Sequence, residues 1–305
     1  MSRQEFATNG IRWVYVTKPN AEDIEYIRQL FPFHQFVMES IVAPTLHPFV
    51  EDFDNHLFLI LHFPIIYRGH QENKVAEIDF LVAKDILVTI TYLDFERFDK
   101  VYQFFKATMA EITQPNHRNA GFLLYRIIDR LFGEHLQDLD VLEKAITKIE
   151  HKIFEKRGHL TVEDISHVRR DIIDFRKPLR SQATVLTTFR EKAERFYGKQ
   201  MAPYLHDLSV TEDRVLTFIE NQREKMDMLY ETHVSLLSSH ISRIISTLTL
   251  FSAIILPLSF LASIWGMNQK VMPLRDEPYD FWIVVGIMAA VTLGLLLYFR
   301  KKQWL

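Results

Sequence analysis

The 305-residue chain contains no cysteine and only 9 glycines. The absence of cysteine excludes disulfides, thiolate zinc sites and cysteine nucleophiles. Scarce glycine, in a chain with long periodic segments, favours long helices over a turn-rich β fold. The 36 basic residues are balanced by 39 acidic ones, and the net charge of −3 gives no reason to expect nucleic-acid binding.

The amino terminus, MSRQEFATNG, lacks the apolar run and the small-residue cleavage site of a secretory signal. We therefore expect the N-terminal part of the chain to stay in the cytoplasm.

Charge is absent from two long segments near the carboxyl terminus. Residues 244–265 read IISTLTLFSAIILPLSFLASIW, and residues 281–299 read FWIVVGIMAAVTLGLLLYF. A helix rises about 1.5 Å per residue, so both runs can cross a hydrocarbon core about 30 Å thick. The alternative is a buried helix of a soluble protein, but such helices rarely stay uncharged for so long. The two runs predict two transmembrane helices.

A basic cluster follows the second run directly, at Arg300, Lys301 and Lys302. Such clusters mark the cytoplasmic side of a membrane. Two spans then return the N-terminus to the same side. We expect a multi-pass protein of the cell (inner) membrane with both termini cytoplasmic, an external loop at 266–280 and a basic tail at 300–305.

Residues 1–118 mix strand and helix signals. Ala21–Phe31 is helix-like and Pro32 closes it. Three segments are rich in β-branched and aromatic residues, as strands are: Ile11–Val16, His56–Tyr67 and Ile78–Tyr92. The prediction is an α+β cytoplasmic domain. Without a glycine-rich phosphate loop or a nucleophile elbow, the sequence does not predict an enzyme.

Residues 119–202 are predicted to form a cytoplasmic helical region. Mostly apolar residues recur there at alternating steps of three and four, a heptad seam that packs along another helix: Ile128, Leu131, His135, Leu139, Leu142, Ile146, Ile149 and Ile153. Gly158 breaks this helix, and a second begins near Val162, which Pro178 should kink or split. A third begins near Pro203, and residues 203–265 should form one long stalk helix that continues into the first span.

Small and hydroxylated residues form a stripe along the first span. Steps of three and four select Ser242, Ile245, Thr249, Ser252, Leu256, Ser259, Ser263 and Gly266, of which five carry a hydroxyl. One interpretation is close helix–helix packing, which small residues permit in membranes. The other is a pore wall in a symmetric oligomer, with apolar rings that gate by dewetting. The candidate pore-lining residues are Ser242, Ile245, Leu248, Thr249, Ser252, Leu256, Ser259 and Ser263.

The same stripe, continued backwards, reaches Glu231 and Glu224. In a symmetric oligomer these side chains would form carboxylate rings, which raise the local concentration of cations. The alternative is an ordinary solvated helix face.

The first span ends in Trp265-Gly266-Met267-Asn268. Together with its position, this motif resembles the CorA family of divalent-cation channels, whose signature is GMN at the same place. Further segments are similar to family elements: Leu256-Pro257-Leu258-Ser259-Phe260, Met272-Pro273, Pro178-Leu179-Arg180, Tyr204-Leu205-His206-Asp207 and the basic tail. The resemblance is loose over the whole chain and close over residues 203–305.

The resemblance implies a funnel-shaped homopentamer that carries Mg²⁺. Gly266, Met267 and Asn268 would form the external selectivity filter. Mg²⁺ gives up its waters reluctantly, so a ring of five Asn268 carbonyls suits a hydrated ion. The family also uses intracellular Mg²⁺ as a closing signal between neighbouring subunits. Asp207 matches one carboxylate of that regulatory site, and Glu96 is the expected partner within the group Asp94, Glu96 and Asp99.

The external loop departs from the family pattern. Gln269 follows the motif where Phe is usual, and Leu274 stands where Glu is usual. These departures leave room for another cargo. A zinc or other transition-metal transporter of the same superfamily is the nearest alternative, with His206, His233 and His240 on the stalk as nitrogen ligands. A membrane-anchored scaffold without transport is a more distant one, and it does not explain the hydroxyl stripe.

Overall fold

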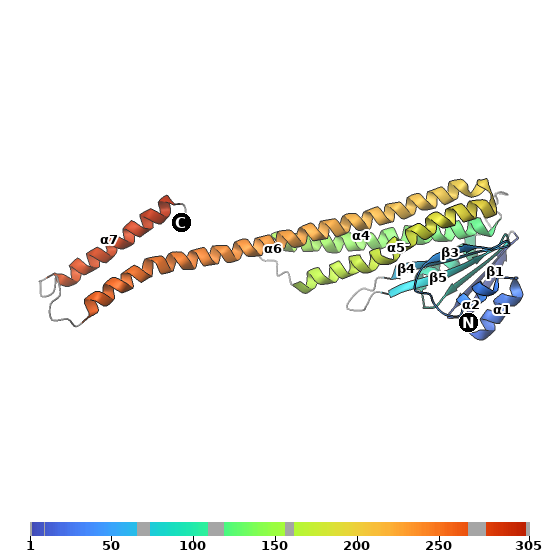
Figure 1. The fold of residues 1–305 in the computed structure, drawn as a ribbon, viewed down its shortest axis with the longest axis horizontal. Helices are drawn as coiled ribbons and strands as arrows, with labels where there is room; N and C mark the ends of the chain where they lie inside the picture. Colours follow the sequence, from blue (N-terminus) through green and yellow to red (C-terminus); the bar gives the residue numbers. More distant parts are fainter. Residues whose placement is uncertain are drawn as a thin grey trace. The chain divides into compact units, whose positions relative to one another are not determined.

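The computed structural model describes residues 2–8, 10–65, 74–108, 119–155, 162–267 and 279–302. The chain divides into two compact units, Met1–Leu229 and Tyr230–Leu305. The first unit contains every strand of the described structure, and the second is helical (Figure 1).

The first unit is built on a six-stranded mixed sheet in the order β1-β2-β6-β5-β4-β3. Only the β2–β6 pair is parallel, and the other neighbours are antiparallel. The strands are β1 (Arg3–Thr8), β2 (Ile11–Thr17), β3 (Phe49–Asp52), β4 (Leu57–Ile65), β5 (Lys74–Val82) and β6 (Ile86–Thr91).

Helices cover both faces of this sheet, as they do in a layered α/β unit. One face packs with the short helices α1 (Ala21–Leu30) and α2 (Gln35–Ser40), around Ile27, Val37 and Ile41. The other face packs with α3 (Glu96–Thr108) and the long helices through a larger core. Successive strand residues point to opposite faces, which explains why Phe80 and Leu81 lie in different cores.

Two long helices complete the first unit, α4 (Ala120–Phe154) and α5 (Val162–Tyr197), and a short 3₁₀ turn, η3 (Lys199–Met201), follows. Asn119 caps α4 by accepting the Phe122 N–H at 2.7 Å. The predicted seam of α4 is confirmed: its members are buried, and Ile153 packs against the same core from a half-buried position. The expected split at Pro178 is wrong, because α5 is helical across this residue.

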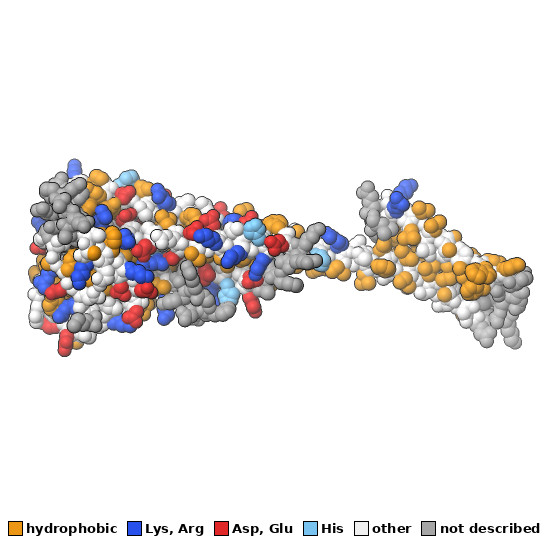
Figure 2. Space-filling model, turned by 180° about the vertical axis from the view of Figure 1, so that it is seen from behind, with side chains coloured by type: hydrophobic (Ala, Val, Ile, Leu, Met, Phe, Trp, Pro, Cys, Tyr) orange, Lys and Arg blue, Asp and Glu red, His pale blue; other side chains and the backbone are white. Residues whose placement is uncertain are grey.

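The helix α6 (Ala202–Gly266) is helical throughout, including Pro257, and α7 (Asp280–Lys301) follows. The first part of α6 belongs to the first unit and presents a buried seam that includes Leu205, Leu208, Val215 and Ile219. From Tyr230 onward α6 belongs to the second unit, together with α7. Hydrophobic side chains dominate the surface of these two segments (Figure 2).

Candidate functional site

The hydroxylated stripe of α6 lies on an uncovered side of the helix. Every predicted stripe residue from Ser242 to Ser263 is exposed, and Ile245, Leu248 and Leu256 are 58%, 65% and 68% exposed. The half-buried residues of the same segment recur at steps of three and four elsewhere: Leu250, Ala253, Ile254, Pro257, Leu258, Leu261, Ile264 and Trp265. With 3.6 residues per turn, the two sets are centred about half a turn apart.

This separation bears on the helix-packing interpretation of the stripe. Small residues in membrane helices serve close packing when a neighbour covers them. Between Leu250 and Trp265 the half-buried side of α6 is apolar, and the hydroxyl-bearing side is exposed together with apolar side chains such as Phe251 and Ile255. The stripe therefore does not serve packing within the described part of the second unit. The Thr249 hydroxyl, which belongs to the stripe, donates to the Ile245 carbonyl of its own helix at 2.8 Å.

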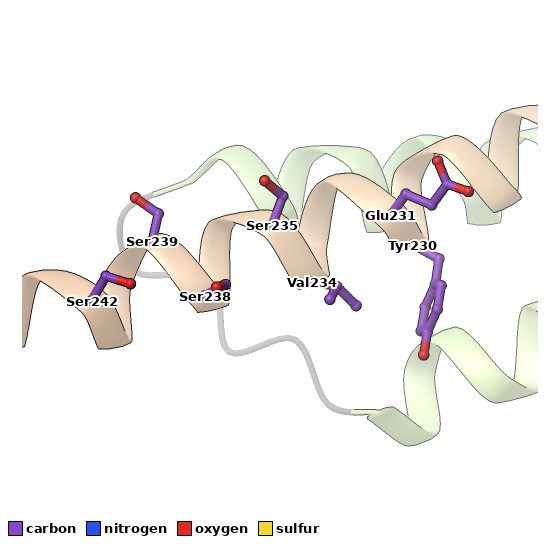
Figure 3. Close-up of a pocket in the computed structure, with 7 residues that line it drawn as sticks. All are labelled: Tyr230, Glu231, Val234, Ser235, Ser238, Ser239 and Ser242. Atoms are coloured by element: carbon purple, nitrogen blue, oxygen red, sulfur yellow. The ribbon is translucent and has the colours of Figure 1, made fainter.

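Between Tyr230 and Ser242, before the predicted pore-lining residues, α6 carries further polar side chains. Figure 3 shows Glu231, Ser235, Ser238, Ser239 and Ser242 along one segment of α6, where they line a shallow groove with Tyr230 and Val234. All of them are exposed. The groove is thus a carboxylate followed by serine hydroxyls, a surface that hydrogen-bonds water or a hydrated cation.

The residues at which the stripe was predicted to continue into the first unit are also exposed. Asn221, Glu224 and Met228 are exposed. Their neighbours Gln222, Met226 and Leu229 are buried and supply the packing of α6. Between Asn221 and Met228 the predicted face of α6 is therefore exposed, and packing within the first unit uses the opposite residues.

The helix ends at Gly266, one residue before the chain leaves the described range. The Met267 N–H donates to the Ile264 carbonyl at 3.2 Å, which closes the last turn. Gly266 has no atom within contact distance of where a Cβ would stand. Asn268, the third residue of the predicted filter, lies outside the described residues, as does the external loop up to residue 278.

The predicted regulatory residue Asp207 lies near the start of α6, beside α4. The Tyr125 hydroxyl donates to Asp207 Oδ2 at 2.7 Å, and the Thr211 hydroxyl donates to Asp129 Oδ1 at 3.4 Å. Tyr204 packs against Phe122 and Tyr125 with ring centroids 5.0 and 5.3 Å apart. Tyr204 and Asp207 thus both contact α4: the Tyr204 ring packs against two aromatic rings, and the Asp207 carboxylate accepts the Tyr125 hydroxyl.

Two carboxylates are close enough here to affect each other. Burial raises the pKa of Asp129 and the charge of Asp207 raises it further. Burial and the bond to Asp207 likewise raise the pKa of Tyr125. Tyr125, Asp129 and Thr211 were not predicted as site residues from the sequence. A signal existed, because each helix contributes an i, i+4 pair, Tyr125 with Asp129 and Asp207 with Thr211.

The other predicted carboxylates have partners of their own. Glu96 is exposed and paired with Lys100 at 2.7 Å, and this bond lowers the pKa of Glu96. Asp94 pairs with Lys18 at 2.5 Å, and Asp99 accepts a bond from the Tyr15 hydroxyl at 2.9 Å. Within the described residues of one chain, no group of three or more acidic or histidine side chains is arranged to hold a metal ion. A regulatory cation site that uses Asp207 and Glu96 would need a second subunit.

Comparison with known proteins decides the family. The profile of the family described as CorA-like Mg2+ transporter protein matches residues 8–301. The chain belongs to this family. The CorA resemblance, loose over the whole chain and close over residues 203–305, is thereby confirmed.

Individual CorA-like relatives agree with this assignment. The cobalt/magnesium transport protein CorA of Thermotoga maritima is 24% identical over 294 residues, which cover 96% of this chain and 83% of the relative. The putative metal ion transporter YfjQ of Bacillus subtilis is 26% identical over 307 residues, covering 96% and 90%. The complete structure of the CorA magnesium transporter from Methanocaldococcus jannaschii has a TM-score of 0.82 at 19% identity, covering 97% and 92%.

The fold prediction is confirmed by this structural match: a mixed-sheet N-terminal domain is followed by long helices and two apolar C-terminal helices. The helices that carry residues 244–265 and 281–299 are long and apolar enough to cross a membrane. As a CorA-type transporter of divalent cations, the chain is a membrane protein, and these helices are its membrane segments.

Proposed function

We propose that this chain forms a homopentameric channel for Mg²⁺, with the open face of α6 lining the shared axis. The observation that carries the proposal is the exposed hydroxyl stripe, which lies about half a turn from the half-buried residues between Leu250 and Trp265, in a chain of the CorA-like family. A single stripe covers only part of a pore wall, so the proposal requires several copies around an axis.

The chemistry of the stripe suits a hydrated ion. Mg²⁺ holds its waters tightly, and neutral hydroxyls can hydrogen-bond those waters without stripping them. Ser252, Ser259 and Ser263 would line wet sections of such a path. Ile245, Leu248 and Leu256 would form apolar rings between them, where a narrow pore empties of water and closes.

Charge would concentrate cations on the cytoplasmic side of these rings. Glu224 and Glu231 are exposed on the same face and have no basic partner in the described structure. Repeated around an axis, they form carboxylate rings that favour cations over anions. At the external end, Gly266, Met267 and Asn268 are the proposed selectivity filter, in which Asn268 offers an uncharged carbonyl to the hydration shell of the ion.

Regulation by the transported ion is the second part of the proposal. Asp207 and Glu96 would bind intracellular Mg²⁺ across a subunit boundary and hold the channel closed. Two unit charges 4 Å apart repel by about 4 kcal/mol at an effective dielectric of 20, and a bound cation removes this cost. The carboxylate of Asp207 accepts one hydrogen bond from Tyr125. A carboxylate has further lone pairs, which remain for a cation.

The proposed placement is the inner membrane, with both termini in the cytoplasm, as the basic residues Arg300, Lys301 and Lys302 indicate. The relative from Thermotoga maritima is named for cobalt as well as magnesium. We include Co²⁺ as further cargo on that basis, and we extend the proposal to Ni²⁺ as another divalent first-row metal ion.

A zinc transporter is the second candidate function. Zinc prefers nitrogen and sulfur ligands, and the stripe from Ser242 to Ser263 contains neither histidine nor cysteine. His233 and His240 are on α6, but the helical period places them about half a turn from the stripe. The geometry thus favours Mg²⁺ as the cargo.

The test is ion flux into liposomes that contain the purified full-length chain. Mg²⁺ should enter faster than Zn²⁺, and Co²⁺ and Ni²⁺ should also enter. Zinc entry at a higher rate than Mg²⁺ would replace the proposed cargo, and no flux of any divalent cation would overturn the channel proposal.

A further inference from the structure

The first unit contains a cavity of about 870 Å³ that the proposed transport function does not use. It lies at one end of the sheet. In the parallel β2–β6 pair, Thr17 lies beside Thr91. Thr91 also lies beside Ile78 of β5, and the preceding residue of β5, Glu77, lies beside His62 of β4. The residues that follow β2 and β6, the first half of β5 and the second half of β4 therefore meet at this end. A cavity beyond the carboxyl ends of parallel strands is a common place for a ligand in α/β proteins.

The floor of the cavity is polar, buried and fixed. Both oxygens of Glu77 accept the Thr45 N–H, at 2.9 and 2.8 Å, and His62 Nε2 lies 3.1 Å from Glu77 Oε2. Glu77 and His62 are only 6% and 8% exposed. Tyr92, which also lines the cavity, donates its hydroxyl to Asp79 Oδ2 at 2.7 Å. The floor thus holds its own polar groups in place, and Glu77 fixes the segment 42–47 over the cavity.

The walls are apolar and open to solvent. Val42, Leu46, Val75 and Leu93 line the cavity, and Leu46 is 88% exposed. These side chains come from separate segments, two from the segment before β3, one from β5 and one from the turn after β6. An exposed aliphatic lining of this kind can cover a short hydrocarbon chain, at a gain of about 0.8 kcal/mol per buried methylene.

The mouth carries positive charge. Lys18 lies there with φ of 52°, in the left-handed region that favours glycine, and its ammonium pairs with Asp94 at 2.5 Å. Lys177 enters from α5, and within the described residues its ammonium has no hydrogen-bond or ionic partner. The Glu77 carboxylate below is already bonded on both oxygens. Of the two ammonium groups at the mouth, that of Lys177 is therefore the one without a partner among the described residues, and it can pair with an anion.

We propose that the cavity binds a single-chain amphipathic carboxylate of the medium-chain fatty acid class. Its hydrocarbon chain lies against Val42, Leu46, Val75 and Leu93, and its carboxylate pairs with Lys177. Ligand sites of about 300 to 1,000 Å³ accommodate molecules of this size. The site is independent of the ion pathway, because all of its residues belong to the sheet end and α5.

The test is calorimetric titration of the full-length chain in lipid nanodiscs with sodium decanoate, with empty nanodiscs as the blank. The expected result is saturable binding of one decanoate per chain. Lys177→Gln should weaken it about tenfold, because it removes a charge-assisted hydrogen bond. Lys148→Gln, which neutralises an exposed lysine of α4, should leave the affinity unchanged. Leu46→Ser should weaken binding about threefold through lost apolar contact.

Neutral 1-decanol has the same hydrocarbon chain without the charge, so it separates the contribution of the carboxylate to binding from that of the chain. It should bind more weakly than decanoate, and Lys177→Gln should not change its affinity. The proposal is overturned if decanoate gives the same heats with empty nanodiscs, or if Lys177→Gln and Lys148→Gln behave alike. It is also overturned if Leu46→Ser changes the oligomeric state and not decanoate binding, because the cavity is then a contact between copies of the chain. None of these measurements depends on ion transport.

Discussion

The helix α4 in the first unit and the end of α6 in the second unit share one spacing and use it in opposite ways. In α4, steps of three and four select apolar residues, and these are buried. In α6 after Ser242, the same steps select hydroxyl-bearing residues among apolar ones, and these residues are exposed. A helix in water hides its apolar stripe, whereas a helix in lipid gains nothing by doing so. The residues that this spacing selects therefore mark one face of each helix, the buried face in α4 and an exposed face in α6.

The largest effect should come from the end of the polar stripe. Asn268→Ala removes the carbonyl that we assign to the external filter, so Mg²⁺ uptake into liposomes should be lost. The proposed pentamer should still assemble, since a single loop side chain contributes little to packing. Size-exclusion chromatography checks assembly in the same preparation. Wild-type flux from a correctly assembled variant would remove Asn268 from the filter.

The stripe itself can be tested by wetting one of its apolar rings. Leu256→Ser should raise the leak of Mg²⁺ several-fold, because a hydroxyl ring holds water where a leucine ring excludes it. Phe251→Ser is the matched control, since Phe251 is similarly exposed, at 59%, but lies off the stripe. Its leak should stay at the wild-type level. Equal leak in the two variants would show that the polar side of α6 does not face the pore.

Regulation should depend on a carboxylate of the first unit. Asp207→Asn should keep the channel conducting at millimolar internal Mg²⁺, where the wild type closes. The Tyr125 hydroxyl can still donate to the amide oxygen, so the helix packing should survive. The measurement is channel current against internal Mg²⁺, with Tyr125→Phe as a variant that loses the hydroxyl and keeps the carboxylate. An inhibition curve identical to that of the wild type would place the regulatory site elsewhere.

Some secondary-structure elements could be predicted from the sequence and others could not, depending on how long and how regular their apolar patterns are. Long helices were predictable, because the seam of α4 and the uncharged runs are strong signals over many residues. The edge strand β1 was not, because its sequence RQEFAT is polar and alternate residues are only half-covered. Ile78–Tyr92 was interpreted as one strand segment, but Ala83 turns the chain through a bond to the Ile86 carbonyl and separates β5 from β6.

At the candidate site, sequence alone reached the residues that carry motifs and missed those that carry only packing. Asp207 was found through its motif with Tyr204, whereas Tyr125 and Asp129 lie about 80 positions earlier and meet Asp207 only in the folded chain. The helix α3 was missed although Phe98, Val101, Tyr102 and Phe105 have helical spacing and are buried. The cavity beside Glu77 could not be foreseen, because it depends on the register of β4, β5 and β6.

A buried acid in the seam of α6 provides a pH test of the first unit. Burial, with a smaller effect from the charge of Asp213, raises the pKa of Glu212 to about 7. In the unfolded chain this carboxyl ionises at its ordinary, lower pKa of 4.5. Its contribution to stability is therefore complete below pH 4.5 and is lost as pH rises through about 7. The difference between the two limits is up to about 3 kcal/mol.

The variant Glu212→Gln should remove this pH dependence. Thermal unfolding of the full-length chain in nanodiscs, followed by circular dichroism at pH 5 and pH 8, gives the measurement. The wild type should lose more stability than the variant between these two pH values. Glu224→Gln, an exposed change on the same helix, should behave like the wild type. If Glu212→Gln also follows the wild type, the carboxyl is ionised in the folded chain throughout this range.

The smallest effect concerns two glycines of α4 that differ only in their surroundings. A Cβ added at Gly121 would come within 2.6 Å of the Tyr197 ring, whereas a Cβ at Gly133 meets no atom within 4 Å. Tyr197 cannot easily give way, because its hydroxyl donates to the Ala83 carbonyl at 2.7 Å. Gly121→Ala should therefore destabilise the first unit by about 1–3 kcal/mol through overpacking. Gly133→Ala should stabilise it by up to about 1 kcal/mol, because alanine favours a helix interior. Thermal unfolding of both variants, each compared with the wild type, measures the contrast. If the two shift stability in the same direction, the close approach of Tyr197 to α4 does not constrain the packing at this position.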